Sequence, residues 1–207
     1  MDIMHEKEAL IIFVRQPVAG CVKTRLAADI GPEAALFVYR ELLAHTRSVC
    51  TQLAVDKYLF YANTIADQDD WDDTYHKQIQ QGNDLGERMQ HAFSLVFGMG
   101  YKRVCIIGSD CLELSADIVK EGYSLLQDNN FVIGPAKDGG YYLLGMRHRL
   151  KPVFDAINWS TSNVFQQTVE KINLLQNSLA LLPVLADIDV VGDLPQAMLE
   201  ALAKRGG

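Results

Sequence analysis

Short apolar runs alternate along this chain with longer stretches in which apolar residues recur every three or four positions. The runs have the length and continuity of strands buried on both faces of a parallel sheet, and they lie at 9–14, 58–61, 103–108, 131–134 and 141–145. The periodic stretches predict amphipathic helices after Pro32, around 85–96, after Ser115, around 165–172 and after Pro195. This alternation favours an α/β fold, and we expect a three-layer α/β/α sandwich around a mostly parallel central sheet.

Some segments carry weaker signals. Residues 78–80 and 179–182 are short extended candidates, and residues 15–31 are expected to form a polar loop. Ser115 has the side chain of a helix N-cap. No linker, repeat or low-complexity tract interrupts the pattern, so we expect one domain over residues 1–207.

The composition is that of a globular chain, with 49% hydrophobic and 22% charged residues over a length of 207. No apolar run approaches the roughly 20 residues that span a bilayer. Acidic residues within 1–8 stand where a secretory signal carries basic ones. These features predict a cytoplasmic protein without a membrane span.

The net charge of −7 argues against nucleic-acid binding through a broad basic surface. The four cysteines form no CxxC pair and no zinc spacing, which predicts free thiols. The acidic run at 67–73 is expected to be a solvated face. The cations are unevenly spread, because Arg15, Lys23 and Arg25 gather in one short segment of an otherwise acidic chain.

That segment, residues 15–26, follows the first predicted strand, and ligands of such sheets bind beyond the carboxyl ends of the strands. Lysine offers a point charge and arginine a bidentate fork, a usual pair for polyphosphate. The segment lacks both the Walker A pattern and G-x-G-x-x-G. A surface loop with solvated cations is an interpretation of equal weight from spacing alone.

Carboxylates follow two later segments. Asp110 comes directly after a buried strand and is suited to hold Mg²⁺ or Mn²⁺, and a cap of the next turn is the alternative interpretation. One aspartate of the pair Asp187 and Asp189 is suited to complete a metal site. Asp193 is expected to cap the closing helix instead.

Three other segments admit both a binding and a purely structural interpretation. Asp84 and Glu87 have the spacing of a capping box, which is the favoured interpretation there. The paired glycines and tyrosines in 137–142 suit close backbone approach and contact with a sugar or base, yet a simple turn explains them equally well. Residues 159–161 are favoured as a helix entry, with an N-cap expected at Thr161 or Ser162.

Taken together, these segments resemble one group of proteins. The motifs are P-x-x-G-x-x-K-T-R-L at 17–26, D-L-G-E-R at 84–88, G-S-D-C at 108–111 and G-P-A-x-D-G-G-Y-Y-L-L-G at 134–145. Their order and spacing resemble a small bacterial family of glycosyltransferase-A-like proteins described as nucleotide-diphospho-sugar transferases, related to phospholactate guanylyltransferases. The resemblance implies a sandwich that binds a nucleoside diphosphate at the carboxyl edge of its sheet.

The resemblance implies roles for the first loop and the acidic segments. Lys23 and Arg25 would hold the phosphates, and we assign the same site to three neighbours in their loop, Arg15, Gly20 and Thr24. The metal-binding aspartate of the family corresponds to Asp110, and Asp189 would be the second ligand of Mg²⁺ or Mn²⁺.

The remaining motifs would serve the sugar and the acceptor. Asp138 would act as a base toward an acceptor hydroxyl. The substrate-binding residues assigned by the resemblance are Asp84, Arg88, Gly139, Gly140, Tyr141 and Trp159. Two positions depart from the family pattern: Leu112 stands where proline is usual, and Val190 where threonine is usual.

Three functions follow from this resemblance. The first is metal-dependent transfer from a nucleoside diphosphate sugar to a small-molecule acceptor. The second is guanylyltransferase-like nucleotidyl transfer to a small phosphorylated acceptor. The third is nucleotide binding without catalysis, which only the departures at Leu112 and Val190 favour. The sequence leaves open which base, sugar, acceptor and oligomeric state apply.

Overall fold

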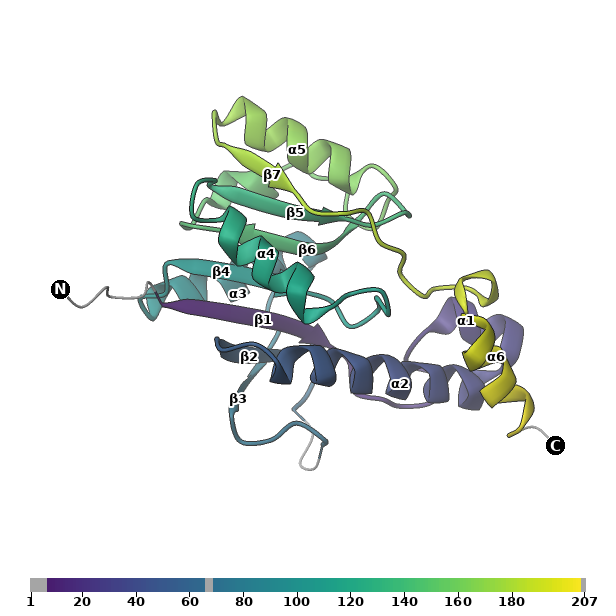
Figure 1. The fold of residues 1–207 in the computed structure, drawn as a ribbon. Coiled ribbons are helices and arrows are strands. Elements are labelled where there is room, and N and C mark those ends of the chain that lie inside the picture. The colour runs from purple at the N-terminus through teal and green to yellow at the C-terminus, as the bar shows by residue number, and fades with distance from the viewer. Residues whose placement is uncertain (1–6, 66–68, 206–207) are drawn as a thin grey trace.

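A computed structural model of the protein describes residues 7–65 and 69–205. Within them, seven strands form one sheet in the order β3-β2-β1-β4-β6-β5-β7 (Figure 1). The strands are β1 (Glu8–Val14), β2 (Asp56–Tyr61), β3 (Tyr75–Ile79), β4 (Arg103–Ile107), β5 (Phe131–Pro135), β6 (Tyr141–Met146) and β7 (Leu179–Leu181). Our inferences from residues 1–6 and 67–68 fall outside the described residues.

The strands of the sheet pair in parallel except β6, which runs antiparallel to β4 and β5. The carboxyl ends of β1, β2, β4 and β5 therefore meet at one edge, where β6 begins. Strand β1 lies in the middle of the sheet, and its residues Ala9 to Ile12 are fully buried. This is why the first apolar run is continuous instead of alternating. The predicted mostly parallel α/β sandwich is confirmed.

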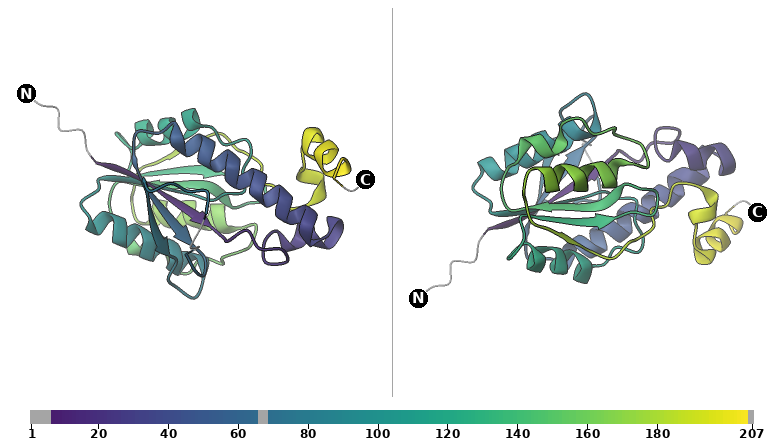
Figure 2. Two further views of the ribbon diagram at one scale, coloured as in Figure 1. Left: turned by 90° about the horizontal axis from the view of Figure 1, so that it is seen from below. Right: turned by 90° about the horizontal axis from the view of Figure 1, so that it is seen from above.

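Helices cover both faces of the sheet (Figure 2). The helices α2 (Pro32–Thr51) and α4 (Ala116–Leu125) pack on one face, and α3 (Leu85–Gly98) and α5 (Val164–Leu174) on the other. The helices α1 (Thr24–Ile30) and α6 (Gln196–Ala203) lie together beyond the carboxyl edge. Two short 3₁₀ turns complete the elements, η1 (Lys151–Phe154) and η2 (Val191–Asp193).

Several predicted helix starts are confirmed. Ser115 accepts a hydrogen bond from the backbone of Ile118 at 3.3 Å and caps α4. Asp84 caps α3 by accepting from Glu87 N at 2.8 Å. The return bond of that cap goes from Asn83 N to the Glu87 carboxylate, one residue before the expected partner.

Two expected caps are wrong. Helix α5 has Asn163 at its N-cap position, because Thr161 uses its hydroxyl to donate to Asn158 O within the preceding turn. Helix α6 has Pro195 at that position, whereas Asp193 bonds to the backbone upstream. Helix α1 replaces part of the loop expected over residues 15–31.

Two other local expectations need correction. Strand β3 begins at Tyr75, three residues before the predicted segment, and lies at the edge of the sheet. Within the acidic run, the Asp69 carboxylate is only 10% exposed and is paired with Lys77 at 2.8 Å. That aspartate is therefore not part of a solvated face. No helix in the described part of the chain has both the length and the apolarity needed to cross a membrane.

Candidate functional site

A cleft of about 600 Å³ opens at the carboxyl edge of the sheet. Its walls come from the segments after β1 and β4, the start of α3, the start of β6 and the chain before η2. The charged residues that line it are Arg15, Lys23, Arg25, Asp84, Arg88, Asp110, Asp187 and Asp189. Segments more than 160 positions apart in the sequence thus meet in one cleft.

Lys23 lies between the two carboxylates predicted as metal ligands. Its Nζ is 2.8 Å from Asp110 and 3.2 Å from Asp189, and its side chain is only 5% exposed. Arg25 also pairs with Asp189. Lys23 has a left-handed backbone, with φ 47° and ψ 48°, at the N-cap position of α1. Non-glycine residues rarely adopt this conformation, and such strain is concentrated at functional sites.

Backbone hydrogen bonds hold the acidic segments next to one another. Ile188 N donates to Asp110 O at 2.9 Å, which joins the end of β4 to the chain before η2. The Asp193 carboxylate accepts from the backbone N–H groups of Asp189 and Val190, at 2.9 and 2.8 Å. Because Val190 contributes its main chain to this turn, the side chain that departs from the family pattern does not alter the bond.

Asp187 lies in the cleft close to other carboxylates. Burial, with the nearby charges of Asp110 and Asp138, raises the pKa of Asp187 to about 7. Lys23 acts in the opposite direction but does not cancel the effect. Burial is the main cause of this shift, and because neighbouring carboxylates add to it, added positive charge is stabilising at this place.

The donor set fits a hard divalent cation. Among the described residues, no group of three or more His, Cys, Asp or Glu side chains is arranged to hold a metal ion. Magnesium, however, is commonly held by one or two carboxylates together with substrate phosphates and water. Asp110 and Asp189 supply two carboxylates beside the cationic loop, which is the chemistry that such an ion requires.

Tyr39 on α2 joins the segment after β1 to the segment after β4. Its hydroxyl accepts from Arg15 N at 2.8 Å, lies 3.2 Å from Arg15 O as a donor, and is 3.4 Å from Ser109 Oγ. The tyrosine is 3% exposed, and burial raises its pKa, so it stays protonated as a donor. It therefore fixes the end of β1 relative to the residue that precedes Asp110.

The opposite wall of the cleft is apolar and aromatic. It is formed by Phe13, Leu85, Met89 and Tyr141, and Arg88 lies beside them. The Arg88 Nε donates to Gly82 O at 3.1 Å, which fixes the guanidinium at the start of α3. The cleft therefore has one strongly charged end and one wall suited to a ring.

Two glycines allow close packing around this wall. A Cβ on Gly86 would collide with the Trp159 indole, so the absence of a side chain there lets α3 approach residue 159. Gly139 has φ +90°, and a Cβ on it would collide with the backbone of Ser162. Phe165 N also donates to Gly139 O at 2.9 Å. The glycine loop is thereby held against the start of α5.

The structure brings together many of the residues singled out from the sequence. Those that line the cleft are Arg15, Lys23, Thr24, Arg25, Asp84, Arg88, Asp110, Tyr141 and Asp189. The others do not line it, namely Gly20, Asp138, Gly139, Gly140 and Trp159. The Asp138 carboxylate accepts from Gly140 N at 2.8 Å, and its charge still acts on Asp187, so it lies near the acidic end.

Sequence reasoning missed the lining residue Tyr39 and the unusual pKa of Asp187. Tyr39 has the spacing of a core position in α2, and no motif marks it. Asp187 was named with Asp189 as a candidate metal ligand and the resemblance assigned that role to Asp189, but no sequence signal predicted the raised pKa of Asp187. To predict which carboxylate has a raised pKa, one must know how deeply each is buried, and burial depends on the fold.

Comparisons with known proteins show the family and the fold of this chain. Residues 44–161 match the family model described as "Uncharacterized protein conserved in bacteria (DUF2064)". A crystal structure described as a "putative nucleotide-diphospho-sugar transferase" from Desulfovibrio desulfuricans is 32% identical, with a TM-score of 0.86. The match covers 97% of this chain and 98% of that one.

More distant structures share the fold. The 4-diphosphocytidyl-2C-methyl-D-erythritol synthase of Anaerococcus prevotii has a TM-score of 0.58 at 11% identity, covering 98% of this chain and 97% of that chain. Mycobacterium tuberculosis Rv0371c, crystallised with manganese, has a TM-score of 0.53 at 12% identity, covering 96% and 98%. A search of curated protein sequences finds no match.

Proposed function

The chain belongs to the DUF2064 family, and from this premise we propose that it is a metal-dependent transferase acting on a nucleoside diphosphate sugar. The observation that carries the proposal is the meeting of Lys23 with Asp110 and Asp189 in a cleft of about 600 Å³. Cations and paired carboxylates side by side suit a polyphosphate and a divalent ion together. The description of the relative from D. desulfuricans supports the same class.

The cationic loop would hold the diphosphate. Arg15, Lys23, Thr24 and Arg25 line one end of the cleft, and Gly20 has φ +76° in the turn between Arg15 and Lys23. Negative charge grows on the diphosphate as the glycosidic bond breaks. Fixed cations that face this group stabilise it more in the transition state than in the ground state.

The two carboxylates would hold Mg²⁺ or Mn²⁺. Such an ion, bound to the substrate phosphates, supplies further neutralisation of the leaving group. In this structure the Lys23 ammonium balances Asp110 and Asp189. When substrate binds, we expect that ammonium to turn from the carboxylates to the diphosphate oxygens. A similar fold crystallised with manganese is consistent with this assignment.

The sugar would lie along the apolar wall, and the acceptor hydroxyl would lie toward the acidic end. Asp84, Arg88 and Tyr141 line the cleft there and offer hydrogen-bond partners for hydroxyl groups. Asp138, at the margin of the acidic end, would take the proton from an acceptor hydroxyl. Gly139, Gly140 and Trp159 would shape this wall through packing, since they do not line the cleft themselves.

Nucleotidyl transfer is the second candidate, because fold relatives include named nucleotidyltransferases. Besides the A. prevotii synthase, they include an inositol-1-phosphate CTP transferase. The same cations and carboxylates would then act on a nucleoside triphosphate. The two reactions differ in their released product, which is a nucleoside diphosphate in the first and pyrophosphate in the second.

Thermal denaturation with a panel of ligands tests the proposal. Purified protein is heated with UDP, GDP, their sugar conjugates or nucleoside triphosphates, each with and without Mn²⁺ or Mg²⁺. A ligand at 100 times its Kd adds about 2.7 kcal/mol to stability. For a chain of this length we expect the Tm to rise by roughly 5–10 °C. A metal-dependent rise with diphosphate sugars supports glycosyl transfer, and a preference for triphosphates supports nucleotidyl transfer.

Substitutions of single aspartates show which residue binds the metal ion. Asp110→Asn should keep the fold but lose the metal-dependent part of the shift, because an amide is a poor ligand for a hard cation. Asp128→Asn, an exposed substitution of the same chemistry after α4, should keep the full shift. Full metal-dependent binding by the Asp110 variant would refute the assigned metal site. The absence of any shift across the panel would refute the proposed substrate class.

A further inference from the structure

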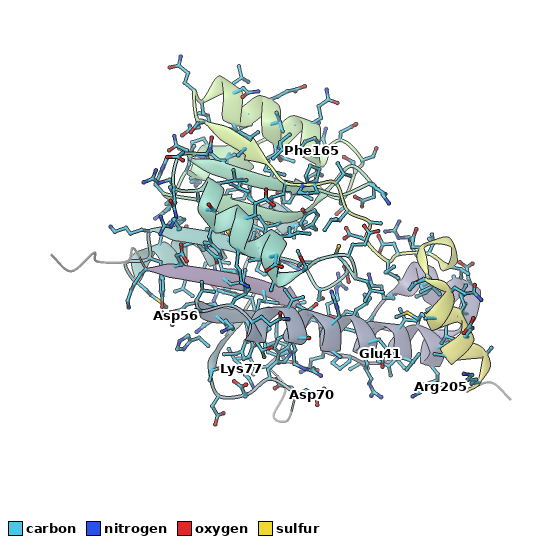
Figure 3. All side chains as sticks on the ribbon, viewed as in Figure 1. Glu41, Asp56, Asp70, Lys77, Phe165 and Arg205 are labelled. Atoms are coloured by element: carbon cyan, nitrogen blue, oxygen red, sulfur yellow. The ribbon has the colours of Figure 1, made fainter. Side chains whose placement is uncertain are left out.

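A second cavity, of about 380 Å³, lies on the α2 flank of the molecule. It is bounded by the segment after β1, by α2, by the end of β2 and by residues 69–71. Figure 3 shows Asp70 beside α2 on this flank. We call it the arginine pocket, and its lining residues are Arg15, Pro17, Arg40, Leu43, Arg47, Tyr61, Asp69, Asp70 and Trp71.

Three guanidinium groups gather around this cavity in a chain whose net charge is −7. Arg47 pairs with Asp70 at 3.1 Å and lies over the Trp71 ring, 5.6 Å from its centre. The side chains of Arg15 and Arg40 form no hydrogen bond or ion pair with other described residues, and both residues are exposed. Like charges that line one cavity repel one another, and an anion bound among them would relieve that repulsion.

The acidic residues of the pocket do not balance these cations. The Asp69 carboxylate accepts from Lys77 at 2.8 Å, from Trp71 N at 3.0 Å and from the Tyr61 hydroxyl, so its charge is already compensated. Asp70 is the other carboxylate among the described lining residues, and its side chain is 78% exposed. Among the described lining residues, three guanidinium groups therefore face one uncompensated carboxylate, that of Asp70, which pairs with Arg47.

We propose that the arginine pocket is a binding site for the phosphate or carboxylate group of a small-molecule ligand. Guanidinium forks match the planar and tetrahedral oxyanions of these groups, and contact with Trp71 already orients Arg47. The cavity has the liquid volume of on the order of ten water molecules, which exceeds what one anionic group fills. The rest of the ligand would contact Pro17 and Leu43.

This site is separate from the cleft that holds Lys23 and Asp110. The two cavities share Arg15, but Arg40 and Arg47 line only the arginine pocket and Arg25 lines only the cleft. Substitution of a residue that lines only one cavity changes that cavity and leaves the lining of the other unaltered. The proposal therefore does not depend on the reaction assigned to the cleft.

Trp71 provides an optical probe, because the chain has only two tryptophans. In a Trp159→Phe background, fluorescence reports Trp71 alone. Inorganic phosphate and, separately, citrate are titrated at constant ionic strength, with sodium chloride as the reference titration. We expect a saturable change in Trp71 emission that chloride does not produce. A lower Kd for phosphate or for citrate identifies which oxyanion chemistry the site prefers.

Variants in the same background decide the location. Arg40→Ala should raise the Kd at least tenfold, and its exposed position on α2 with alanine's high helix propensity keeps the fold intact. Arg47→Ala is a second test of the same prediction. Arg25→Ala, in the cleft, and Arg149→Ala, an exposed arginine after β6, should leave the Kd unchanged.

Three results would overturn the proposal. The first is the absence of a saturable change with either anion. The second is a Kd that is equal in the Arg40 and Arg149 variants, which would indicate a general charge effect. The third is loss of the signal in the Arg25 variant, which would place the anion in the cleft.

Discussion

Lys23 combines a rare backbone conformation with a buried charge. Its left-handed φ and ψ cost on the order of 1–2 kcal/mol for a residue with a side chain. Two features hold it there: its ammonium contacts Asp110 and Asp189, and its carbonyl accepts from Ala27 N at 2.8 Å. A glycine would satisfy the backbone, so the presence of lysine indicates that the charge is what the site needs.

Substitution of Lys23 separates these two effects. Lys23→Ala should lower the unfolding free energy by about 1–3 kcal/mol in metal-free buffer at pH 8, because Asp110 and Asp189 lose their buried partner. Lys23→Gly should lose about 1 kcal/mol less, since glycine accepts the positive φ. Urea denaturation measures both. Equal stability of wild type and Lys23→Ala would show that the pairing contributes nothing.

At the scale of elements, the start of α3 depends on its contact with residue 159. Gly86 is buried in the first turn of the helix, where alanine would ordinarily be preferred by up to about 1 kcal/mol. The Trp159 ring occupies the place that a Cβ would take. The glycine in the D-L-G-E-R motif is thus explained by packing, and Asp84 and Arg88 are placed in the cleft by the same contact.

A double-mutant cycle tests this explanation, because the effect of Gly86→Ala on stability should change sign when the Trp159 ring is removed. Gly86→Ala should destabilise the protein by about 1–3 kcal/mol, because the added methyl group collides with the indole. In a Trp159→Ala background, the same substitution should be neutral or stabilising, since helix propensity then dominates. Urea denaturation of the four proteins measures the coupling. Equal effects in both backgrounds would exclude the contact as the cause.

The elements differ in how well the sequence predicts them. Strand β1 and helix α2 were predicted within a residue or two at their starts, because an apolar run or a helical period is a local signal. Helix α1 was missed because it has seven residues and only one fully buried side chain, Leu26. Strand β3 was displaced because an edge strand with half-exposed residues lacks a clear alternation.

At the scale of the whole molecule, the fold concentrates negative charge from distant segments. Asp110 follows β4, Asp138 lies between β5 and β6, and Asp187 and Asp189 come from the chain before η2. Burial, followed by the charges of Asp110 and Asp138, raises the pKa of Asp187 from 3.8 to about 7. The unfolded chain separates these carboxylates, so the shift links folding to pH.

Because the pKa of Asp187 is higher in the folded chain than in the unfolded chain, this residue makes the protein less stable as pH rises. Between about pH 4 and pH 7 the unfolded chain has ionised Asp187 while the folded chain keeps it protonated, so stability falls as pH rises. Asp187→Asn removes that loss. Its stability relative to wild type should rise between pH 4 and pH 8 by up to about 4 kcal/mol in metal-free buffer.

Urea denaturation at pH 4, 6 and 8 measures the effect. Asp128→Asn, an exposed aspartate outside the cleft, is the control and should follow wild type throughout. A stability difference between Asp187→Asn and wild type that is constant with pH would contradict the raised pKa.

The sequence by itself determined the strands and main helices, the mostly parallel sheet, and the edge at which Lys23, Asp110 and Asp189 would meet. These follow from periodicity over a few residues and from the rule that loops after parallel strands share one edge. Only the tertiary structure decided that Tyr39 links Arg15 to Ser109, that Asp187 is the perturbed carboxylate, and that Arg40 and Arg47 join Trp71 around a second cavity. The physical reason is that burial, charge and contact between distant residues are set by packing, and no local pattern carries that information.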